Sequence, residues 1–336
     1  MKDNKSNDKG LNGKNILVTG GTGSFGRAFV RTVLASHNPA KLVIYSRDEH
    51  KQVAMAEDFS DSRLRFFIGD IRDLSRLTLA MREIDIVVHA AAMKHVPVAE
   101  YNPMECVRTN VLGADNIVRA SLDCGVDRVV ALSTDKASNP INLYGATKLV
   151  SDKIFIASQN LSGSIGTRFC VVRYGNVIGS RGSVVLTFKR LIEEGAKELP
   201  ITDDRMTRFW ITLDHGVNFV ISSLETMHGG ELFVPKIPSM KVVDLASAMA
   251  PQLKQKIVGI RPGEKLHETM ISSDDARDCL DLGDRYVVQP RFSFWNAHNY
   301  ANVGKPVSES FTYASDNNSR WLEAKDLRGL LVNGVS

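Results

Sequence analysis

The chain has 336 residues, of which 43% are hydrophobic and 24% are charged, and this composition is typical of a globular protein. Its length exceeds what a single core usually requires, so we expect two lobes. No apolar run reaches the length of a membrane span, which argues against a transmembrane segment. The net charge of +4 is spread along the chain, which argues against nucleic-acid binding and suits a small anionic ligand.

The first residues and the cysteines both indicate a cytoplasmic protein. Residues 1–12 are polar and lack the apolar core of a signal peptide, so they predict a disordered start. No two cysteines have CxxC spacing, and most lie in apolar or helical contexts, which predicts buried free thiols in a reducing compartment. The four cysteines are Cys106, Cys124, Cys170 and Cys279.

The first half alternates nearly continuous apolar runs, typical of parallel strands covered on both faces, with stretches of helical spacing. The predicted strands are 15–19, 42–46, 64–68, 84–90, 128–133 and 169–174, and the clearest helices are 25–34, 74–81 and 110–124. This alternation predicts an α/β fold with a doubly wound parallel sheet of the Rossmann type over residues 13–177. After residue 177 the predicted elements are shorter, and proline and glycine residues separate them. We therefore expect residues 178–336 to form mainly a smaller substrate-binding lobe, interleaved with the last sheet strands.

A glycine-rich turn follows the first predicted strand. Gly20, Gly23 and Gly26 have the spacing GxxGxxG and lead directly into a helix. Glycine permits a tight turn and lets backbone N–H groups approach a pyrophosphate closely. In this strand–turn–helix context the spacing predicts a dinucleotide-binding turn. The residues expected to contact the cofactor here are Gly20, Thr22, Gly23, Ser24, Phe25 and Gly26.

The end of the second predicted strand favours NADP over NAD. NAD enzymes usually place a carboxylate at this point, whereas Ser46 and Arg47 offer a hydroxyl and a cation to a 2′-phosphate. Lys51 adds a second cation one turn into the next helix. Asp48 is better interpreted as an N-cap than as a ribose ligand.

The next two strand ends also carry candidate cofactor contacts. Asp70 and Ile71 follow the third strand, where the carboxylate would either meet the adenine amino group or form a turn. Ala90, Ala91 and Ala92 follow the fourth strand. Their small side chains suit either a cofactor ribose or tight packing of a helix on the sheet.

The fifth predicted strand leads into a candidate catalytic set. Thr134, Asp135 and Lys136 end this strand, and Tyr144 and Lys148 follow at i, i+4 on one helix face. A lysine beside a tyrosine can lower the pKa of the phenol, which then acts as a general base, and can hold a nicotinamide ribose. In isolation, Asp135 and Lys136 fit a solvated loop pair equally well.

These motifs resemble the extended short-chain dehydrogenases. The run STDKASNPINLYGATK from Ser133 to Lys148 resembles, more narrowly, the inverting UDP-N-acetylglucosamine 4,6-dehydratases, which start pseudaminic acid and related surface-sugar pathways. Three further segments fit the same family: YGNVIGSRG at 174–182, RMTRFW at 205–210 and RPGEKLHE at 261–268. The resemblance covers residues 14 to 330.

The resemblance implies a lyase that uses NADP within each turnover. Tyr144 would take the proton of the C4 hydroxyl as hydride leaves C4, with Thr134 assisting. Lys136, if its environment keeps it neutral, would remove the C5 proton. A protonated Asp135 would donate a proton to the departing C6 hydroxyl. Hydride would return to C6, and protonation of C5 from the opposite face would invert that centre.

Binding of the UDP-sugar is expected to involve residues outside the glycine-rich turn. Arginine suits bidentate contact with a diphosphate, and a glutamate can accept hydrogen bonds from ribose hydroxyls. The expected substrate contacts are Lys94, Asn176, Arg208, Arg261 and Glu264, and Lys94 is also expected at the cofactor. No metal site is expected, because Ile271 stands where the zinc motif HExxH beginning at His267 would need its second histidine. His89 and His95 are expected to be structural.

Two other functions were weighed. A UDP-sugar 4-epimerase needs only the Tyr144/Lys148 pair, so this function assigns no role to Asp135 and Lys136. A non-catalytic NADP-sensing regulator has no need of an intact Tyr/Lys pair. The family also suggests a homo-oligomer, either a dimer or a hexamer, with apolar helices such as 110–124 available for an interface.

Overall fold

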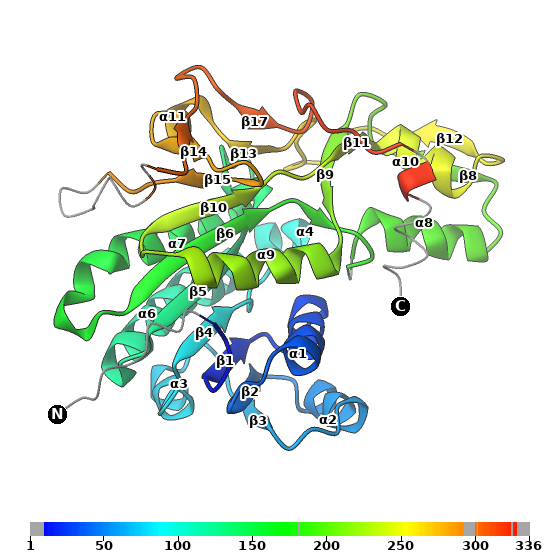
Figure 1. Cartoon of the computed structure of the whole chain (residues 1–336). Helices are drawn as coiled ribbons and strands as arrows, with labels where there is room; N and C mark the ends of the chain where they lie inside the picture. Colours follow the sequence, from blue (N-terminus) through cyan, green and yellow to red (C-terminus); the bar gives the residue numbers. More distant parts are fainter. Residues whose placement is uncertain (1–9, 181, 292–299, 301, 324, 328–336) are drawn as a thin grey trace.

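A ten-stranded sheet organises the computed structural model, which describes residues 10–180, 182–291, 300, 302–323 and 325–327 (Figure 1). The strand order is β16-β14-β15-β10-β6-β5-β4-β1-β2-β3, and the strands from β10 to β3 run parallel. The parallel strands are β1 (Asn15–Thr19), β2 (Lys41–Ser46), β3 (Leu64–Ile68), β4 (Ile86–His89), β5 (Arg128–Thr134), β6 (Arg168–Tyr174) and β10 (Glu231–Pro235). The predicted doubly wound Rossmann sheet is confirmed, and the six predicted strands differ from the observed ones only at their ends.

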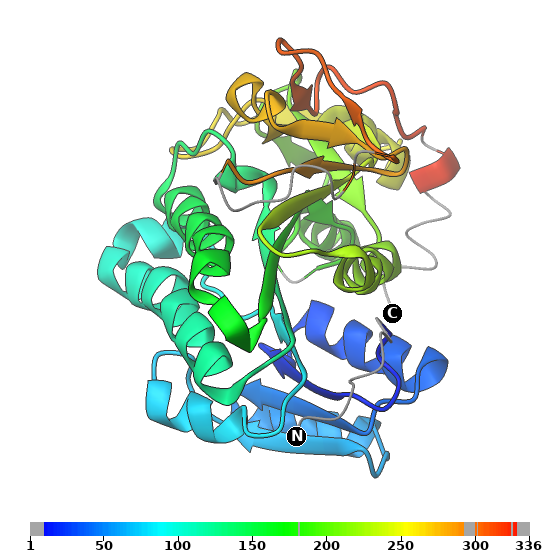
Figure 2. The same cartoon turned by 60° about the vertical axis from the view of Figure 1, so that its left-hand side comes forward.

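Helices cover both faces of this sheet (Figure 2). On one face α1 (Ser24–Ser36) packs against α9 (Leu213–Thr226), and on the other α6 (Gly113–Cys124) contacts α3 (Leu74–Ala80) and α7 (Leu143–Ala157). The predicted helix 110–124 begins differently, because a π-helical turn, Arg108–Leu112, precedes α6. The remaining helices of this half are α2 (Glu49–Asp58), α4 (Val96–Tyr101) and α5 (Pro103–Val107).

The second half of the chain contributes to the main sheet and also builds separate elements. Antiparallel β15 (Arg285–Val288) and β14 (Cys279–Asp281), followed by β16 (Lys305–Pro306), extend the main sheet beyond β10. A three-stranded sheet holds β7 (Asn176–Val177), β9 (Thr207–Ile211) and β11 (Ser239–Lys241). Two ladders pair β8 (Glu198–Ile201) with β12 (Lys254–Ile257) and β13 (Thr269–Ile271) with β17 (Tyr313–Ala314).

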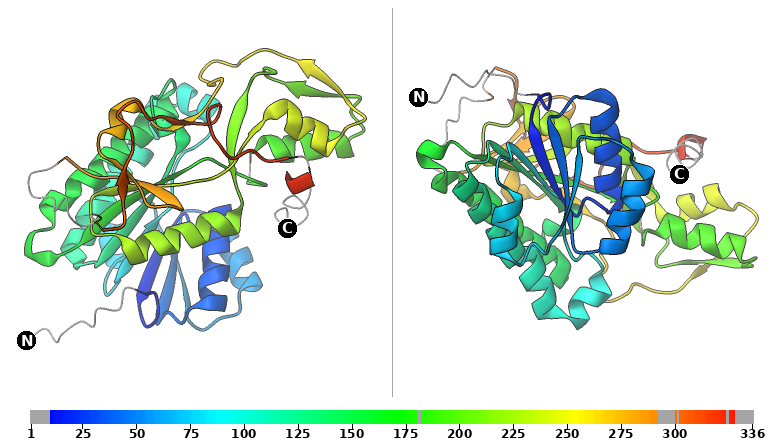
Figure 3. Two further views of the ribbon diagram at one scale, coloured as in Figure 1. Left: turned by 45° about the horizontal axis from the view of Figure 1, so that its top comes forward. Right: turned by 90° about the horizontal axis from the view of Figure 1, so that it is seen from below.

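This second group of elements has its own apolar core. It contains the helices α8 (Val184–Glu193) and α10 (Val242–Met249), and Figure 3 shows them beside β8 and β12, away from the main sheet. Phe188, Trp210 and Leu245 are buried together there, separately from the core that surrounds the main sheet. The short α11 (Ser273–Ala276) follows β13.

The start of the described chain corrects one expectation. Leu11 is fully buried in the main core, and the carbonyl of Gly10 accepts a hydrogen bond from the guanidinium of Arg128. Residues 10–12 are therefore not a disordered start, because an apolar side chain anchors them to the core, while residues 1–9 lie outside the described residues. All four cysteines are free, and Cys106, Cys170 and Cys279 are buried. Among the described helices, none combines the length and the apolar character needed to cross a membrane.

Candidate active site

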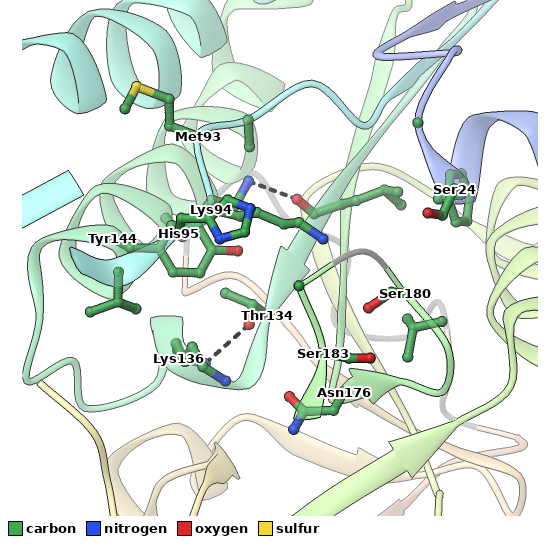
Figure 4. Close-up of a pocket in the computed structure, with 18 of the residues that line it drawn as sticks. Ser24, Met93, Lys94, His95, Thr134, Lys136, Tyr144, Asn176, Ser180 and Ser183 are labelled. Carbon is green, nitrogen blue, oxygen red and sulfur yellow. Dashed lines mark hydrogen bonds between the residues drawn. The ribbon is translucent and has the colours of Figure 1, made fainter. Parts of the chain in front are cut away.

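One large cavity lies at the carboxyl ends of the parallel strands and extends to the second apolar core. Its volume is about 1240 Å³, and Figure 4 shows side chains from several elements around it. Every residue expected to contact cofactor or substrate lines this cavity. Of the expected catalytic residues, Thr134, Lys136, Tyr144 and Lys148 line it, whereas Asp135 is fully buried beneath its wall. The fold thus brings together residues that are far apart in the sequence.

The glycine-rich turn is shaped by close backbone contacts. Gly20 has φ +65°, and a Cβ placed on it would lie 2.9 Å from the Cα of Ala91. A Cβ on Gly26 would lie 2.4 Å from Gly21. Gly23 caps α1 without any side-chain hydrogen bond to the helix start, and the first turn of α1 carries no acidic residue. Free N–H groups and the positive end of the helix dipole therefore face the cavity, an arrangement that fits a pyrophosphate.

At the end of β2 the cations lie close to carboxylates. The guanidinium of Arg47 is 3.6 Å from Oδ2 of Asp70, and the ammonium of Lys51 pairs with Asp48. Oδ1 of Asp48 also accepts a hydrogen bond from the backbone N–H of Lys51, which makes Asp48 the N-cap of α2, as predicted. The hydroxyl of Ser46 accepts a hydrogen bond from Gln52.

Tyr144 and Lys148 are one turn apart on α7, and both are buried at the cavity wall. The ammonium of Lys148 donates a 2.7 Å hydrogen bond to the carbonyl of Leu132 in β5. Burial raises the pKa of Tyr144 to about 12, and the opposing positive charge comes from Lys136. In the protein alone burial thus outweighs the attraction, and the lowering of the phenol pKa by Lys148 stays a prediction.

Lys136 lies between two carboxylates. Its Nζ is 3.0 Å from Oδ1 of Asp135 and 3.0 Å from Oε1 of Glu268. Burial by itself would lower the pKa of Lys136, but the two carboxylates outweigh burial and raise it. The resting lysine is therefore an ammonium, so the condition under which Lys136 was expected to act as a base, a neutral amine, is not met before substrate binds.

The two carboxylates around Lys136 differ in their proton affinity. Burial raises the pKa of Asp135, and the negative charge of Glu268 adds to this effect while Lys136 opposes it. Burial also acts to raise the pKa of Glu268, but Lys136 and Arg208 outweigh burial and lower it. Asp135 is thus the carboxyl group that holds a proton more readily.

Arg208, Arg261 and Glu264 come from the second half of the chain and line the same cavity as the glycine-rich turn. Arg208 is buried, and its guanidinium donates to the carbonyls of Thr207, Leu266 and Lys265. Arg261 is exposed, and its guanidinium is 3.9 Å from Oε1 of Glu264. Arg208 is therefore held in place by the protein, whereas Arg261 retains the exposure that a phosphate contact needs.

Sequence reasoning missed two residues of this site. Glu268 was named only as the end of the family segment 261–268 and as part of a zinc motif, because no spacing in the sequence relates it to Lys136. His95 was expected to be structural, but it lines the cavity beside Gly182 (Figure 4).

His89, in contrast, is buried, and its Nδ1 is 2.8 Å from the hydroxyl of Thr19. Arg181 of the motif at 174–182 lies outside the described residues. Within the described part of the chain, no cluster of His, Cys, Asp or Glu has the geometry of a metal site.

A family comparison agrees with this geometry. The sequence profile described as "Polysaccharide biosynthesis protein" matches residues 16–290. The chain belongs to this family. Within the polysaccharide biosynthesis protein family, a Campylobacter jejuni protein named UDP-N-acetylglucosamine 4,6-dehydratase (inverting) is 58% identical over 323 residues, covering 94% of this chain and 97% of that protein.

Two further relatives differ more. A Rickettsia canadensis protein named UDP-glucose 4-epimerase is 39% identical and covers 95% of both chains. The X-ray structure of Pen from Bacillus thuringiensis superposes with a TM-score of 0.88 at 35% identity, over 96% of this chain and 98% of that one. The relative named as an inverting dehydratase is thus clearly more similar to this chain than the relative named as an epimerase.

Proposed function

We propose that this member of the polysaccharide biosynthesis protein family is an inverting UDP-N-acetylglucosamine 4,6-dehydratase, a hydro-lyase. Its product would be a UDP-2-acetamido-2,6-dideoxy-4-keto-L-hexose, a precursor of pseudaminic acid or a related surface sugar. The carrying observation is that Lys136, held against Asp135, lines the same cavity as Tyr144. A base and an acid for elimination thus accompany the residues for hydride transfer, and the 58% identical relative carries the matching name.

NADP is the proposed cofactor. The uncapped start of α1 and the glycine contacts with Ala91 support a dinucleotide pyrophosphate at the turn. Asp70 and Ile71 border the adenosine end of this site, and the backbone of Ala90, Ala91 and Ala92 lies beside the turn. Ser46, Arg47 and Lys51 line the same end of the cavity, where they would hold a 2′-phosphate. When bound, the nicotinamide would supply a hydride acceptor for C4 and a hydride donor for C6.

The residues of the chain account for the proton transfers. Tyr144 accepts the proton of the C4 hydroxyl in its phenolate form, which burial opposes and which the positive charge of Lys136 and the Thr134 hydroxyl favour. The resulting C4 ketone acidifies the C5 hydrogen, which Lys136 removes after passing its own proton to a carboxylate. Asp135 delivers a proton to the C6 hydroxyl as it leaves as water. Lys148, anchored to the carbonyl of Leu132, positions the nicotinamide ribose.

The UDP part is proposed to lie toward the second apolar core. Arg261 is the proposed bidentate contact for the diphosphate, with Arg208 adding a fixed positive charge behind it. Glu264 would accept hydrogen bonds from ribose hydroxyls, and Asn176 and Lys94 would contact the sugar and its phosphates. This placement supports a division of the chain into a cofactor domain (13–177) and a mainly substrate-binding part (178–336).

We also propose that the protein forms a homo-oligomer, either a dimer or a hexamer. In α6 the apolar residues Ile117, Val118 and Ala120 face the protein's own core and are not available. The exposed apolar side chains lie just before it, where Val98, Tyr101, Met104 and Leu112 are at least half exposed and Tyr101 is 87% exposed. Light scattering after size-exclusion chromatography would measure the mass, and a monomer would contradict the proposal.

Incubation with UDP-N-acetylglucosamine in heavy water tests the main proposal. NMR should show a 6-deoxy-4-keto product with deuterium at C5 and an inverted C5 configuration. Formation of UDP-N-acetylgalactosamine would instead identify a 4-epimerase, in which Asp135 and Lys136 have no assigned role. Absence of turnover with retained NADP binding would favour a non-catalytic sensor.

A further inference from the structure

Glu268 is a second carboxylate in contact with Lys136. Its Oε1 lies 3.0 Å from Nζ of Lys136, the same atom that lies 3.0 Å from Oδ1 of Asp135. The side chain of Glu268 is 2% exposed, whereas that of Lys136 is 24% exposed and reaches the cavity. The Glu268 carboxylate therefore contacts the lysine amine from the protein interior, while Lys136 itself reaches the cavity.

The position of Glu268 is fixed from several sides. Its backbone N–H donates to the hydroxyl of Ser315, and the N–H of Ser315 donates back to the Glu268 carbonyl. The Ser315 hydroxyl in turn lies 2.6 Å from that of Thr207 in β9. Three residues earlier, Lys265 donates a 2.6 Å hydrogen bond to the carbonyl of Ser138. The segment before β13 is thereby held against the turn that carries Asp135 and Lys136.

Asp135 and Glu268 share the Lys136 ammonium, and each has one carboxylate oxygen without a hydrogen bond within the described part of the chain. Oδ2 of Asp135 and Oε2 of Glu268 are both buried, and neither has a hydrogen-bond partner among the described residues. Two buried carboxylates that flank a single ammonium do not both ionise readily, because each adds repulsion to the burial cost of the other. The cluster is therefore built to retain one proton in addition to those of the ammonium.

We propose that Glu268 is a positioning residue for the dehydration, which holds the Lys136 amine and, through its negative charge, keeps the shared proton on Asp135. This inference rests on the proposed function, in which Asp135 acts as the acid. In the resting enzyme Glu268 is ionised beside Lys136, with the guanidinium Nε of Arg208 at 3.8 Å, and it is the carboxylate that takes the lysine proton when the amine acts as base. No bond to substrate forms at Glu268, so its effect is exerted through its two neighbours.

Other charged groups around the cluster differ in their influence. Arg208 and Lys265 both favour the ionised form of Glu268. Tyr144 is near enough to interact with Asp135 but is neutral in the resting enzyme, where its pKa is about 12. Of the groups acting on Asp135, Glu268 is the one whose negative charge favours the protonated acid.

Glu268→Gln removes the charge and preserves the shape. Deuterium incorporation at C5 should fall roughly 10²-fold, a loss typical of a misplaced reacting group, while KM for UDP-N-acetylglucosamine and the initial reduction of NADP⁺ change little. The pH above which elimination declines should move to lower values, because Asp135 loses its proton more easily. Glu268→Asp keeps the charge but shortens the reach, so it should slow elimination and retain the wild-type pH profile.

The matched control is Glu231→Gln, which neutralises another fully buried carboxylate that accepts hydrogen bonds from Tyr300 and from backbone N–H groups. This change should lower thermal stability without altering the pH profile. A wild-type profile in folded Glu268→Gln, or an equal shift in Glu231→Gln, would overturn the inference.

A measurement on the resting enzyme separates this inference from the proposed function. Infrared difference spectra should contain the C=O stretch of a protonated carboxylic acid that disappears in Asp135→Asn. The same band should disappear in Glu268→Gln and persist in Glu268→Asp. If the wild type makes no 4-keto product, the proposed function fails, whereas persistence of the band in Glu268→Gln rejects the role of Glu268 alone.

Discussion

The carboxylate of Asp152 in α7 and the guanidinium of Arg173 in β6 form a buried ion pair at 3.1 Å. The same oxygen of Asp152 accepts a hydrogen bond from Ser133 at the end of β5, and Arg173 also donates to the carbonyl of Met270 in β13. This pair joins the helix of Tyr144, the catalytic strand end and the segment that carries Glu268. It thereby fixes the relative positions of the groups in the site.

Replacing Asp152 by Ala should destabilise the protein by about 3 kcal/mol, because the Arg173 charge remains buried and keeps a longer contact, 3.7 Å to the carboxylate of Asp275, in place of its main partner. Urea denaturation measures the change in the free energy of unfolding. The control is Asp115→Ala, which removes an exposed i, i+4 partner of Arg119 and should cost less than about 1 kcal/mol. Equal losses in the two variants would contradict the importance of burial.

Tyr144→Phe should suppress the first oxidation by roughly 10²–10⁴-fold, as expected when a general base is lost. Binding of NADP should persist, since the phenol contributes one hydroxyl at the edge of a much larger site. Stopped-flow absorbance of the reduced nicotinamide follows this step directly. Rapid formation of NADPH in the variant would show that another group accepts the proton of the C4 hydroxyl.

Arg47→Ala should weaken NADP binding by roughly 10- to 100-fold, the range expected for one charge-assisted hydrogen bond. NAD binding should change little, because NAD lacks the 2′-phosphate. Lys51→Ala should have a smaller effect, since Lys51 is already paired with Asp48. Calorimetric titration of both cofactors checks this preference, and parallel losses for NADP and NAD would remove Arg47 from 2′-phosphate recognition.

The sequence was most informative where function and local structure share one short motif. The glycine turn and the Tyr144/Lys148 pair each lie on one element, so their spacing was sufficient to predict their joint position. Glu268 could not be found in this way, because its contact with Lys136 depends on β13 lying against the turn after β5. The charge states of Tyr144 and Lys136 also escaped prediction, since they depend on burial and on a carboxylate from a distant segment.

His89 should make the protein less stable in acid. Burial, with a smaller contribution from the charge of Lys148, lowers the pKa of His89 to about 3. The unfolded chain therefore binds a proton below its ordinary pKa of roughly 6.5, whereas the folded chain does not until about pH 3. Across this window stability should fall by about 1.4 kcal/mol for each unit of decreasing pH from this residue alone.

Urea denaturation between pH 7 and pH 5 would measure the effect of His89. His89→Gln keeps a polar group beside Thr19 but removes the titration, so its stability should depend less on pH. A pH dependence equal to that of the wild type would show that other groups cause the loss of stability in acid.

Lys136→Ala should separate the two halves of the reaction. The variant keeps Tyr144 and Lys148, so oxidation of C4 with reduction of NADP⁺ should persist. Deuterium exchange at C5 should fall by roughly 10²–10⁴-fold, because the base that removes the C5 proton is missing. Removing the ammonium also leaves Asp135 and Glu268 facing each other, which further raises the proton affinity of this pair. The control Lys254→Ala changes an exposed lysine of β12 and should leave both steps intact. If C5 exchange continues in Lys136→Ala at the wild-type rate, the base for the elimination must be another residue of the cavity.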